Sequence, residues 1–298
     1  MSNTDSLEGS PVIIIAAARS GTKILRSTLA ASSDFVDFPY DINYIWKYGN
    51  YNIPHDELTT NDLRSEIRDF IKKQLRKRLI KKGSGRILEK TVSNCLRVDF
   101  VREVFPKCKI IHLYRDGRDV AVSSKTCWES SLFSERIQQK GDLIKKVAQF
   151  PFAAAWPYLI NYMLNYASRL FSRARSVKSW GPRFKGIDDA VKQYSLIEVC
   201  GIQWARCVAL ALKSLSRLKE NEDYINVRYE DFVKDPLIES QKIIDFLQIR
   251  DYRPIQEYAK KNITANFIGN AKKKLNSEEE KKLLLHISKY LKCLGYIK

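Results

Sequence analysis

The residues best suited to chemistry lie in a short cationic loop, Arg19–Lys23, which reads RSGTK. The apolar run 12–15 before it is typical of a buried parallel strand, and apolar residues recur at helical spacing over 24–29. The first N–H groups of a helix lack internal partners and carry the positive end of its dipole. A strand-to-helix turn of this kind is therefore predicted to bind an anion. The predicted anion-binding residues are Arg19, Ser20, Gly21, Thr22 and Lys23.

The same loop departs from the nucleoside-triphosphate P-loop, G-x-x-x-x-G-K-[ST]. Ala16 stands where that motif has its first glycine, and Thr22 stands where it has its lysine. Lys23 comes one place late and precedes Ile24 instead of a magnesium-binding Ser or Thr. We therefore expect a phosphate cradle without a metal. The alternative is a tight turn with Gly21 at positive φ and no ligand.

A second candidate anion site follows the apolar segment KIIHLY. Arg115 leaves the end of this expected strand, and Ser123 follows eight residues later on the expected helix. Ligands of open parallel sheets bind outside the carboxyl ends of the strands, so Arg115 and the Arg19 loop are predicted to face one crevice. The alternative is an ordinary charged turn.

Composition limits the class of protein. The chain has 298 residues, 44% of them hydrophobic, and a formal net charge of +18, which favours an anionic partner. We expect a single domain over 1–298 with a disordered N-terminus over about 1–10. The six cysteines and three histidines show no metal-ligand spacing, and the N-terminus has no apolar signal core. A cytoplasmic protein with free thiols and no metal is predicted.

Strand and helix patterns alternate along the chain. Strands are expected over 12–16, 86–88, 109–114 and 224–228, and this alternation predicts an α/β fold with a central parallel sheet flanked by helices. A basic amphipathic helix is expected to end at Gly83, and a long core helix to run over about 189–219. Two further helices are expected, one after Asp235 and one from a Ser277/Glu280 capping box.

An aromatic segment interrupts this plan within about 130–190. It is apolar but contains Pro151 and Pro157, so it is a poor bilayer span. We expect an inserted helical lid or packing element. The alternative is an interfacial patch in which Arg169, Arg173 and Arg175 meet lipid head groups.

Four segments, taken in order, resemble a known family. They are RSGTKILRSTL, LEKTVSNCLRVDFVREVFP, KIIHLYRDGRDVAVS and YINVRYEDFVKDP. The chain resembles sulfotransferases that use 3'-phosphoadenosine-5'-phosphosulfate (PAPS), from about Pro11 to its C-terminus. It is closer to bacterial and tyrosylprotein sulfotransferases than to the cytosolic type. The resemblance implies the P-loop-like, three-layer sulfotransferase fold.

The resemblance also implies roles for particular residues. The Arg19–Lys23 loop would bind the 5'-phosphosulfate, while Arg115 and Ser123 would bind the 3'-phosphate. Lys90, in the sequence EKT, would contact the transferring sulfuryl group, and its alternative is a surface lysine. Lys272 would belong to a basic loop that closes over the cofactor. Trp204 would stack near the cofactor or, alternatively, lie in the core.

The transfer also needs a base for the acceptor hydroxyl. Asp41 is the predicted base, since relatives place an acid shortly after the phosphate-binding helix. Asp37 is an alternative, and Asp41 is alternatively a helix cap. Its aromatic neighbours Tyr40, Tyr44 and Trp46 are expected to wall the acceptor pocket. The predicted catalytic residues are Arg19, Asp41 and Lys90, with Arg19 acting by charge because arginine does not readily donate a proton.

These inferences predict a sulfotransferase that transfers the sulfuryl group from PAPS to a hydroxyl of a carbohydrate, polysaccharide or glycolipid. Its expected partners are that acceptor and the inner face of a membrane, touched peripherally, but no nucleic acid. Two alternatives remain open. One is a P-loop kinase or NTPase, and the other is a basic protein that binds nucleic acid or membrane.

Overall fold

The computed structural model describes residues 10–133 and 180–298. Within them, five parallel strands form one sheet in the order β2-β3-β1-β4-β5. The register pairs Val12 with Leu88 on one side of β1 and Ile13 with Ile110 on the other. The strands are β1 Val12–Ile15, β2 Phe35–Asp37, β3 Arg86–Glu89, β4 Lys109–Tyr114 and β5 Tyr224–Arg228.

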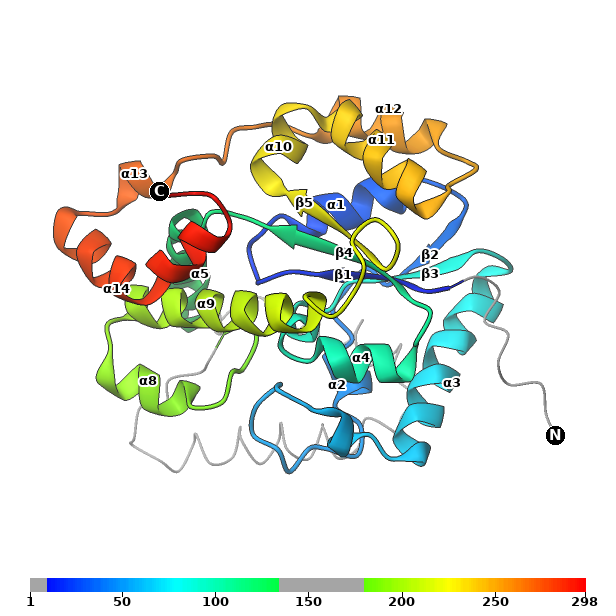
Figure 1. Cartoon of the computed structure of the whole chain (residues 1–298), viewed down its shortest axis with the longest axis horizontal. Helices are drawn as coiled ribbons and strands as arrows, with labels where there is room; N and C mark the ends of the chain where they lie inside the picture. The colour runs from blue at the N-terminus through cyan, green and yellow to red at the C-terminus, as the bar shows by residue number, and fades with distance from the viewer. Residues whose placement is uncertain (1–9, 134–179) are drawn as a thin grey trace.

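Helices connect and cover these strands (Figure 1). They are α1 Thr22–Leu29, α2 Asn43–Trp46, α3 Ser65–Lys82, α4 Val98–Val104, α5 Gly117–Phe133, α8 Ile187–Gln193, α9 Leu196–Leu215, α10 Tyr229–Lys234, α11 Pro236–Leu247, α12 Arg253–Asn262, α13 Ala271–Lys274 and α14 Ser277–Cys293, with the 3₁₀ turns η1 Thr60–Asp62 and η2 Val92–Leu96.

The side chains of β1 alternate between two hydrophobic cores. Val12 and Ile14 face a core shared with α1, α11 and α12, whereas Ile13 and Ile15 face a core shared with α3, α4, α5, α9 and α14. Figure 1 shows these two groups of helices on opposite faces of the sheet. All four residues are completely buried, as expected for a central strand of a parallel sheet.

This architecture confirms the predicted α/β fold. The four predicted strands are present, and α3 stops at the predicted Gly83, its C-cap, with its four core-facing residues buried at helical spacing. The sequence analysis did not identify β2, because a strand of three residues is too short to show a period. That the whole chain forms one domain stays a prediction.

Two predicted helices differ in their boundaries. The long core helix is split into α8 and α9, because Ser195 and Glu198 form a capping box that starts a new helix after Tyr194. The cap of the last helix lies one residue earlier than predicted, since Asn276 and Glu279 form the capping box instead of Ser277 and Glu280, and the helix begins at Ser277. The helix α11 begins at Pro236 after Asp235, as predicted.

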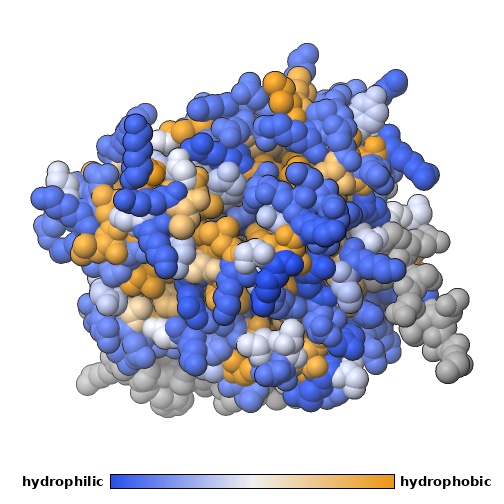
Figure 2. Space-filling model, in the orientation of Figure 1, coloured by the Kyte–Doolittle hydropathy of each residue, from blue (hydrophilic) through white to orange (hydrophobic). Residues whose placement is uncertain are grey.

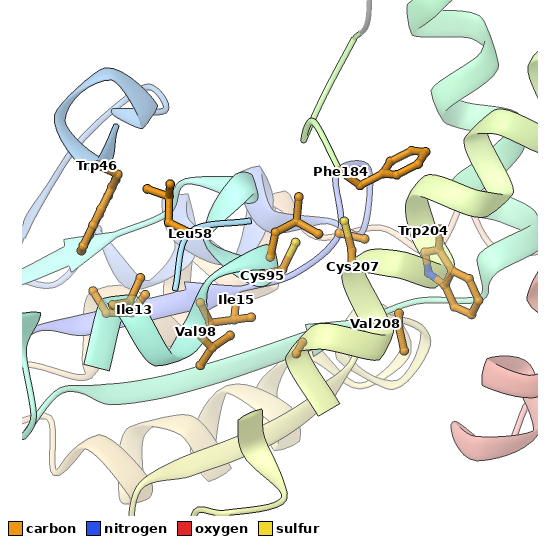
Figure 3. Packing of buried hydrophobic residues seen from close by; sticks show 14 of the residues in the cluster. Ile13, Ile15, Trp46, Leu58, Cys95, Val98, Phe184, Trp204, Cys207 and Val208 are labelled. Atoms are coloured by element: carbon orange, nitrogen blue, oxygen red, sulfur yellow. The ribbon is translucent and has the colours of Figure 1, made fainter. Parts of the chain in front are cut away.

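Two tryptophans considered for ligand contact lie in the core. Trp204 is 1% exposed and belongs to the same packed cluster as Cys207 and Val208 (Figure 3). Its indole also packs against Gly117, where an added Cβ would lie 2.7 Å from the ring. Trp46 is completely buried and meets Phe105 edge to face. Trp46 therefore cannot wall an acceptor pocket, and Trp204 matches its alternative prediction as a core residue.

The surface in Figure 2 is mostly hydrophilic, with smaller hydrophobic areas between the polar side chains. No helix in the two described ranges is long and apolar enough to cross a membrane. The aromatic part of the predicted insertion, including Arg169, Arg173 and Arg175, lies outside the described residues.

Candidate active site

The Arg19–Lys23 loop has the backbone of an anion cradle. Arg19 and Gly21 have positive φ values of 67° and 92°, and Gly21 is the N-cap of α1. No side chain caps this helix within the described part of the chain, so its first N–H groups are available to a ligand. The Tyr229 ring packs so closely on Gly21 that an added Cβ would lie 2.4 Å from a ring carbon.

The second anion-binding element meets this loop directly. The Arg19 Nε donates a hydrogen bond of 2.9 Å to the Ser123 Oγ on α5. The Arg115 Nη1 donates one of 3.0 Å to the backbone oxygen of Arg19. The structure therefore brings the ends of β1 and β4 together at the carboxyl edge of the sheet.

Arg115 holds three segments in place and is only 6% exposed. Its other terminal nitrogen donates to the Phe267 backbone oxygen and lies 3.5 Å from the Asp119 carboxylate. Its guanidinium carbon lies 4.4 Å from the centre of the Tyr229 ring. The buried Arg115 Nε has no hydrogen-bond partner in the described ranges, so this group still has donor capacity.

Asp119 fixes the loop that precedes α13. Its two carboxylate oxygens accept hydrogen bonds from the backbone nitrogens of Gly269 (2.7 Å) and Ala271 (2.8 Å). This side chain is 3% exposed, so water competes weakly for these charge-assisted bonds. The basic loop that the sequence indicated is thus held beside Arg115.

Together these elements line a cleft of about 510 Å³, a volume typical of small-ligand sites. Four of its lining side chains are cationic and one is anionic: Arg19, Lys23, Arg115 and Lys274 against Asp119. Aromatic rings of Tyr229, Tyr258 and Phe267 add apolar wall, and Phe267 is 59% exposed at this cleft. A ligand with both negative charge and a flat apolar part fits this lining.

Two of the predicted cofactor residues do not line the cleft. Lys272 is exposed on α13, and Lys274, two residues further along the chain, contributes to the lining instead. Ser20 is 1% exposed and lines a separate cavity of about 10 Å³ beside Trp204. The buried Ser20 Oγ has no hydrogen-bond partner within residues 10–133 and 180–298.

The predicted base and the predicted sulfuryl-contacting lysine form an ion pair. The Lys90 Nζ donates to the Asp41 Oδ1, and the Val92 backbone nitrogen approaches the Asp41 Oδ2 at 3.5 Å. Asp41 does not cap α2, whose N-cap is Ile42. The alternative acid, Asp37, lies 3.2 Å from the buried Arg26 and is therefore held in a structural pair.

A buried carboxyl, that of Glu89, lies next to the Asp41–Lys90 ion pair in the chain and shares its hydrogen-bond network. Glu89 is completely buried, and its oxygens accept from the Thr91 hydroxyl and, at 2.9 Å, from the Asn94 side-chain amide. The Thr91 Oγ1 also accepts from the Ile42 backbone nitrogen at 3.0 Å, which ties this network to the Asp41 turn. Burial raises the pKa of the Glu89 carboxyl to about 7.

Near this turn, Tyr40 and Tyr44 are partly exposed and remain candidates for an acceptor wall. Burial raises the pKa of Tyr44, with a further contribution from Tyr40, so its phenol stays protonated. In the described residues, no group of three or more His, Cys, Asp or Glu side chains is placed to hold a metal ion.

Several residues of the site were not found by sequence reasoning. Tyr229 lay within the quoted segment YINVRYEDF, which was the only available signal for it. Asp119, Phe267 and Lys274 reach the cleft through contacts between distant segments. Asp119 stands in the segment KIIHLYRDGRDVAVS and Lys274 stands in the predicted basic loop, but their contacts at the cleft depend on the tertiary structure.

A known protein family matches this chain. A model described as the sulfotransferase family matches residues 11–178, more than half of the chain. No curated protein sequence matches.

Similar folds are found among solved structures at low sequence identity. The sulfotransferase STF9 from Mycobacterium avium is 12% identical, with a TM-score of 0.55 over 97% of this chain and 78% of that one. A sulfotransferase domain from the curacin biosynthetic pathway is 14% identical, with a TM-score of 0.53 over 93% and 97%. One from the olefin synthase of Synechococcus PCC 7002 is 12% identical, with a TM-score of 0.52 over 92% and 93%. At these identities the likeness shows the fold alone.

Proposed function

Because this chain belongs to the sulfotransferase family, we propose that it transfers the sulfuryl group of PAPS to a hydroxyl acceptor. The observation that carries the proposal is the meeting of two anion-binding elements on one cleft, where the Arg19 Nε lies 2.9 Å from the Ser123 Oγ. A cofactor with phosphate groups at the 3' and 5' positions of its ribose needs two such anion-binding elements side by side.

The chemistry of the cleft fits that cofactor. The uncapped N–H groups at the start of α1, in the Arg19–Lys23 loop, would hold the 5'-phosphosulfate. Arg115 and Ser123 would hold the 3'-phosphate, to which the unpartnered Arg115 Nε is one available donor. Lys274, which lines the cleft, and Lys272, the residue predicted from the sequence, would add charge from the last loop. When bound, PAPS supplies an activated sulfuryl group.

The residues of the chain stabilise charge and move one proton. Arg19 and Lys90 offer fixed cations for the negative charge that develops on the leaving phosphate, and the loss of one such donor typically costs about 3 kcal/mol of barrier. Asp41 would take the acceptor proton. Its ion pair with Lys90 places the carboxylate beside the cation that would meet the sulfuryl group.

The acceptor we propose is a hydroxyl of a carbohydrate, polysaccharide or glycolipid, met in the cytoplasm or at the inner face of a membrane. Its support is the net charge of +18 and the tyrosines Tyr40 and Tyr44 beside Asp41. Phenolic rings suit the apolar faces of sugars, and a positive surface attracts acidic glycans and lipids.

Calorimetric titration tests the cofactor assignment without an acceptor. Adenosine 3',5'-bisphosphate, 5'-AMP and ATP would each be titrated with EDTA and with magnesium. We expect selective, metal-independent binding of the bisphosphate. Preference for ATP with magnesium would favour a kinase, and steeply salt-dependent binding of any nucleic acid without bisphosphate selectivity would favour a basic binding protein.

A pair of variants on α5 makes the test specific to the 3'-phosphate. Ser123→Ala removes a hydroxyl that lines the cleft, whereas Ser130→Ala changes an exposed serine on the same helix. We expect Ser123→Ala to weaken bisphosphate binding about tenfold and to leave 5'-AMP binding unchanged. Ser130→Ala should change neither affinity.

A further inference from the structure

The C-terminal segment reaches the carboxyl ends of β4 and β5. Tyr296, two residues from the end of the chain, donates a hydrogen bond of 2.7 Å from its hydroxyl to the Glu230 Oε2. Its ring lies 4.4 Å below the Arg228 guanidinium and meets Tyr114 edge to face at 6.3 Å. One side chain therefore contacts the last residues of both strands.

Glu230 transmits this contact to the turn that carries Arg115. Its second oxygen, Oε1, accepts a hydrogen bond of 3.0 Å from the Asp116 backbone nitrogen. Glu230 is only 6% exposed, and Arg228 lies 3.6 Å from the carboxylate oxygen that also binds Tyr296. The carboxylate is thus oriented by Tyr296 and Arg228 on one side and holds the Arg115–Asp116 peptide on the other.

Tyr229, which lies between Arg228 and Glu230 in the sequence, packs its ring against both Arg115 and Gly21. A shift of Glu230 would move Tyr229 with it, since the two residues begin the same helix, α10. Burial raises the pKa of the Tyr296 hydroxyl, and the Glu230 charge raises it further, so the phenol stays a donor at physiological pH.

We propose that Tyr296 is a positioning residue that, through Glu230, holds the Arg115 turn in the geometry that recognises a 3'-phosphate. This inference rests on the proposed function and adds to it a part of the chain that the sequence motifs do not reach. Tyr296 is not among the described residues that line the cleft, so its effect is indirect.

Tyr296→Phe tests the inference, because it removes one hydroxyl and keeps the ring between Arg228 and Tyr114. Tyr290→Phe is the matched control, since Tyr290 lies on α14 and packs against the same core. Each variant and the wild type would be titrated with adenosine 3',5'-bisphosphate and with 5'-AMP, which lacks the 3'-phosphate. Unfolding in urea would be followed in parallel.

We expect Tyr296→Phe to weaken bisphosphate binding about tenfold and 5'-AMP binding less than about twofold. Tyr290→Phe should match the wild type for both ligands. An equal loss for both ligands, or unchanged bisphosphate affinity in Tyr296→Phe, overturns the inference while the wild type still prefers the bisphosphate. A wild type without that preference overturns the proposed function itself, and the inference with it.

Discussion

Replacing Gly21 by alanine should damage the cofactor loop more than replacing a glycine of the same backbone conformation elsewhere. Gly21 caps α1 with φ 92° and ψ 12°, and Gly186 caps α8 with φ 91° and ψ 8°. The two sites differ in their surroundings. A Cβ at Gly21 would lie 2.4 Å and 2.6 Å from two carbons of the Tyr229 ring, whereas a Cβ at Gly186 would meet no atom within 4 Å among the described residues.

The two costs can be separated. An L-residue in the left-handed region costs about 1–2 kcal/mol, and both variants carry this cost. Overpacking a filled site costs about 1–3 kcal/mol more, and only Gly21→Ala carries it. We expect Gly186→Ala to lower the free energy of unfolding by about 1–2 kcal/mol and Gly21→Ala by about 2–5 kcal/mol.

Urea unfolding of the two variants measures this difference, and titration with adenosine 3',5'-bisphosphate measures its consequence. Displacing the Tyr229 ring also disturbs its contact with Arg115, so Gly21→Ala should lose bisphosphate binding while Gly186→Ala keeps it. Tyr229→Ala in the Gly21→Ala background removes the clash. The double-mutant cycle should therefore show a coupling energy of about 1–3 kcal/mol.

Equal destabilisation by Gly21→Ala and Gly186→Ala would refute this reasoning, because it would leave the strained backbone as the sole cost. A coupling energy near zero between Gly21 and Tyr229 would refute it as well, since the ring would then not be the atom group that the new methyl meets.

Three further predictions concern carboxylates. Asp41→Asn should lower sulfuryl transfer at least about 100-fold and leave the bisphosphate affinity unchanged in calorimetry. Asp37→Asn, which alters a structural ion pair, should retain transfer. Full activity in Asp41→Asn would show that another residue is the base. Asp119→Ala should free the loop it holds, which would speed tryptic cleavage at the three lysines of α13 and weaken bisphosphate binding; unchanged cleavage would contradict this anchoring. Burial raises the pKa of Glu89 from 4.5 to about 7. Between these pH values the native protein therefore binds more protons than the unfolded chain. Its free energy of unfolding then falls as the pH rises from 4.5 to about 7. In Glu89→Gln this fall, about 3 kcal/mol in full, should vanish from urea unfolding measured from pH 4.5 to 7.5, and an unchanged slope would assign it to another group.

Much of the fold was predictable because its signals are local. A β-branched run followed by a helical period marks β1 and α1, and the same reasoning locates β4 and α5. The helical spacing of apolar residues over about 189–219 could not show that the predicted helix is interrupted. Ser195 breaks this helix between α8 and α9 by capping, and this depends on one hydrogen-bonded pair, not on hydrophobicity.

The candidate site was predictable only in its local parts. Strand-to-helix turns place Arg19 and Arg115 at the same edge of a parallel sheet, so their approach follows from topology. The ion pair of Lys90 and Asp41 joins residues that are 49 apart in sequence. The neighbouring hydrogen bonds of Glu89 show no periodic pattern or motif in the sequence. Such residues are selected by what surrounds them in space, and a single sequence does not record those surroundings.

The cleft takes its walls from parts of the chain that are made at very different times. Arg19 and Ser123 belong to the first half of the sequence, whereas Tyr229 and Lys274 belong to the last quarter. A nascent chain that has not reached residue 274 holds both cationic turns but no closed site. Since a ligand stabilises only the state that binds it, an anion that binds this cleft would stabilise the finished protein and would not stabilise an incomplete chain.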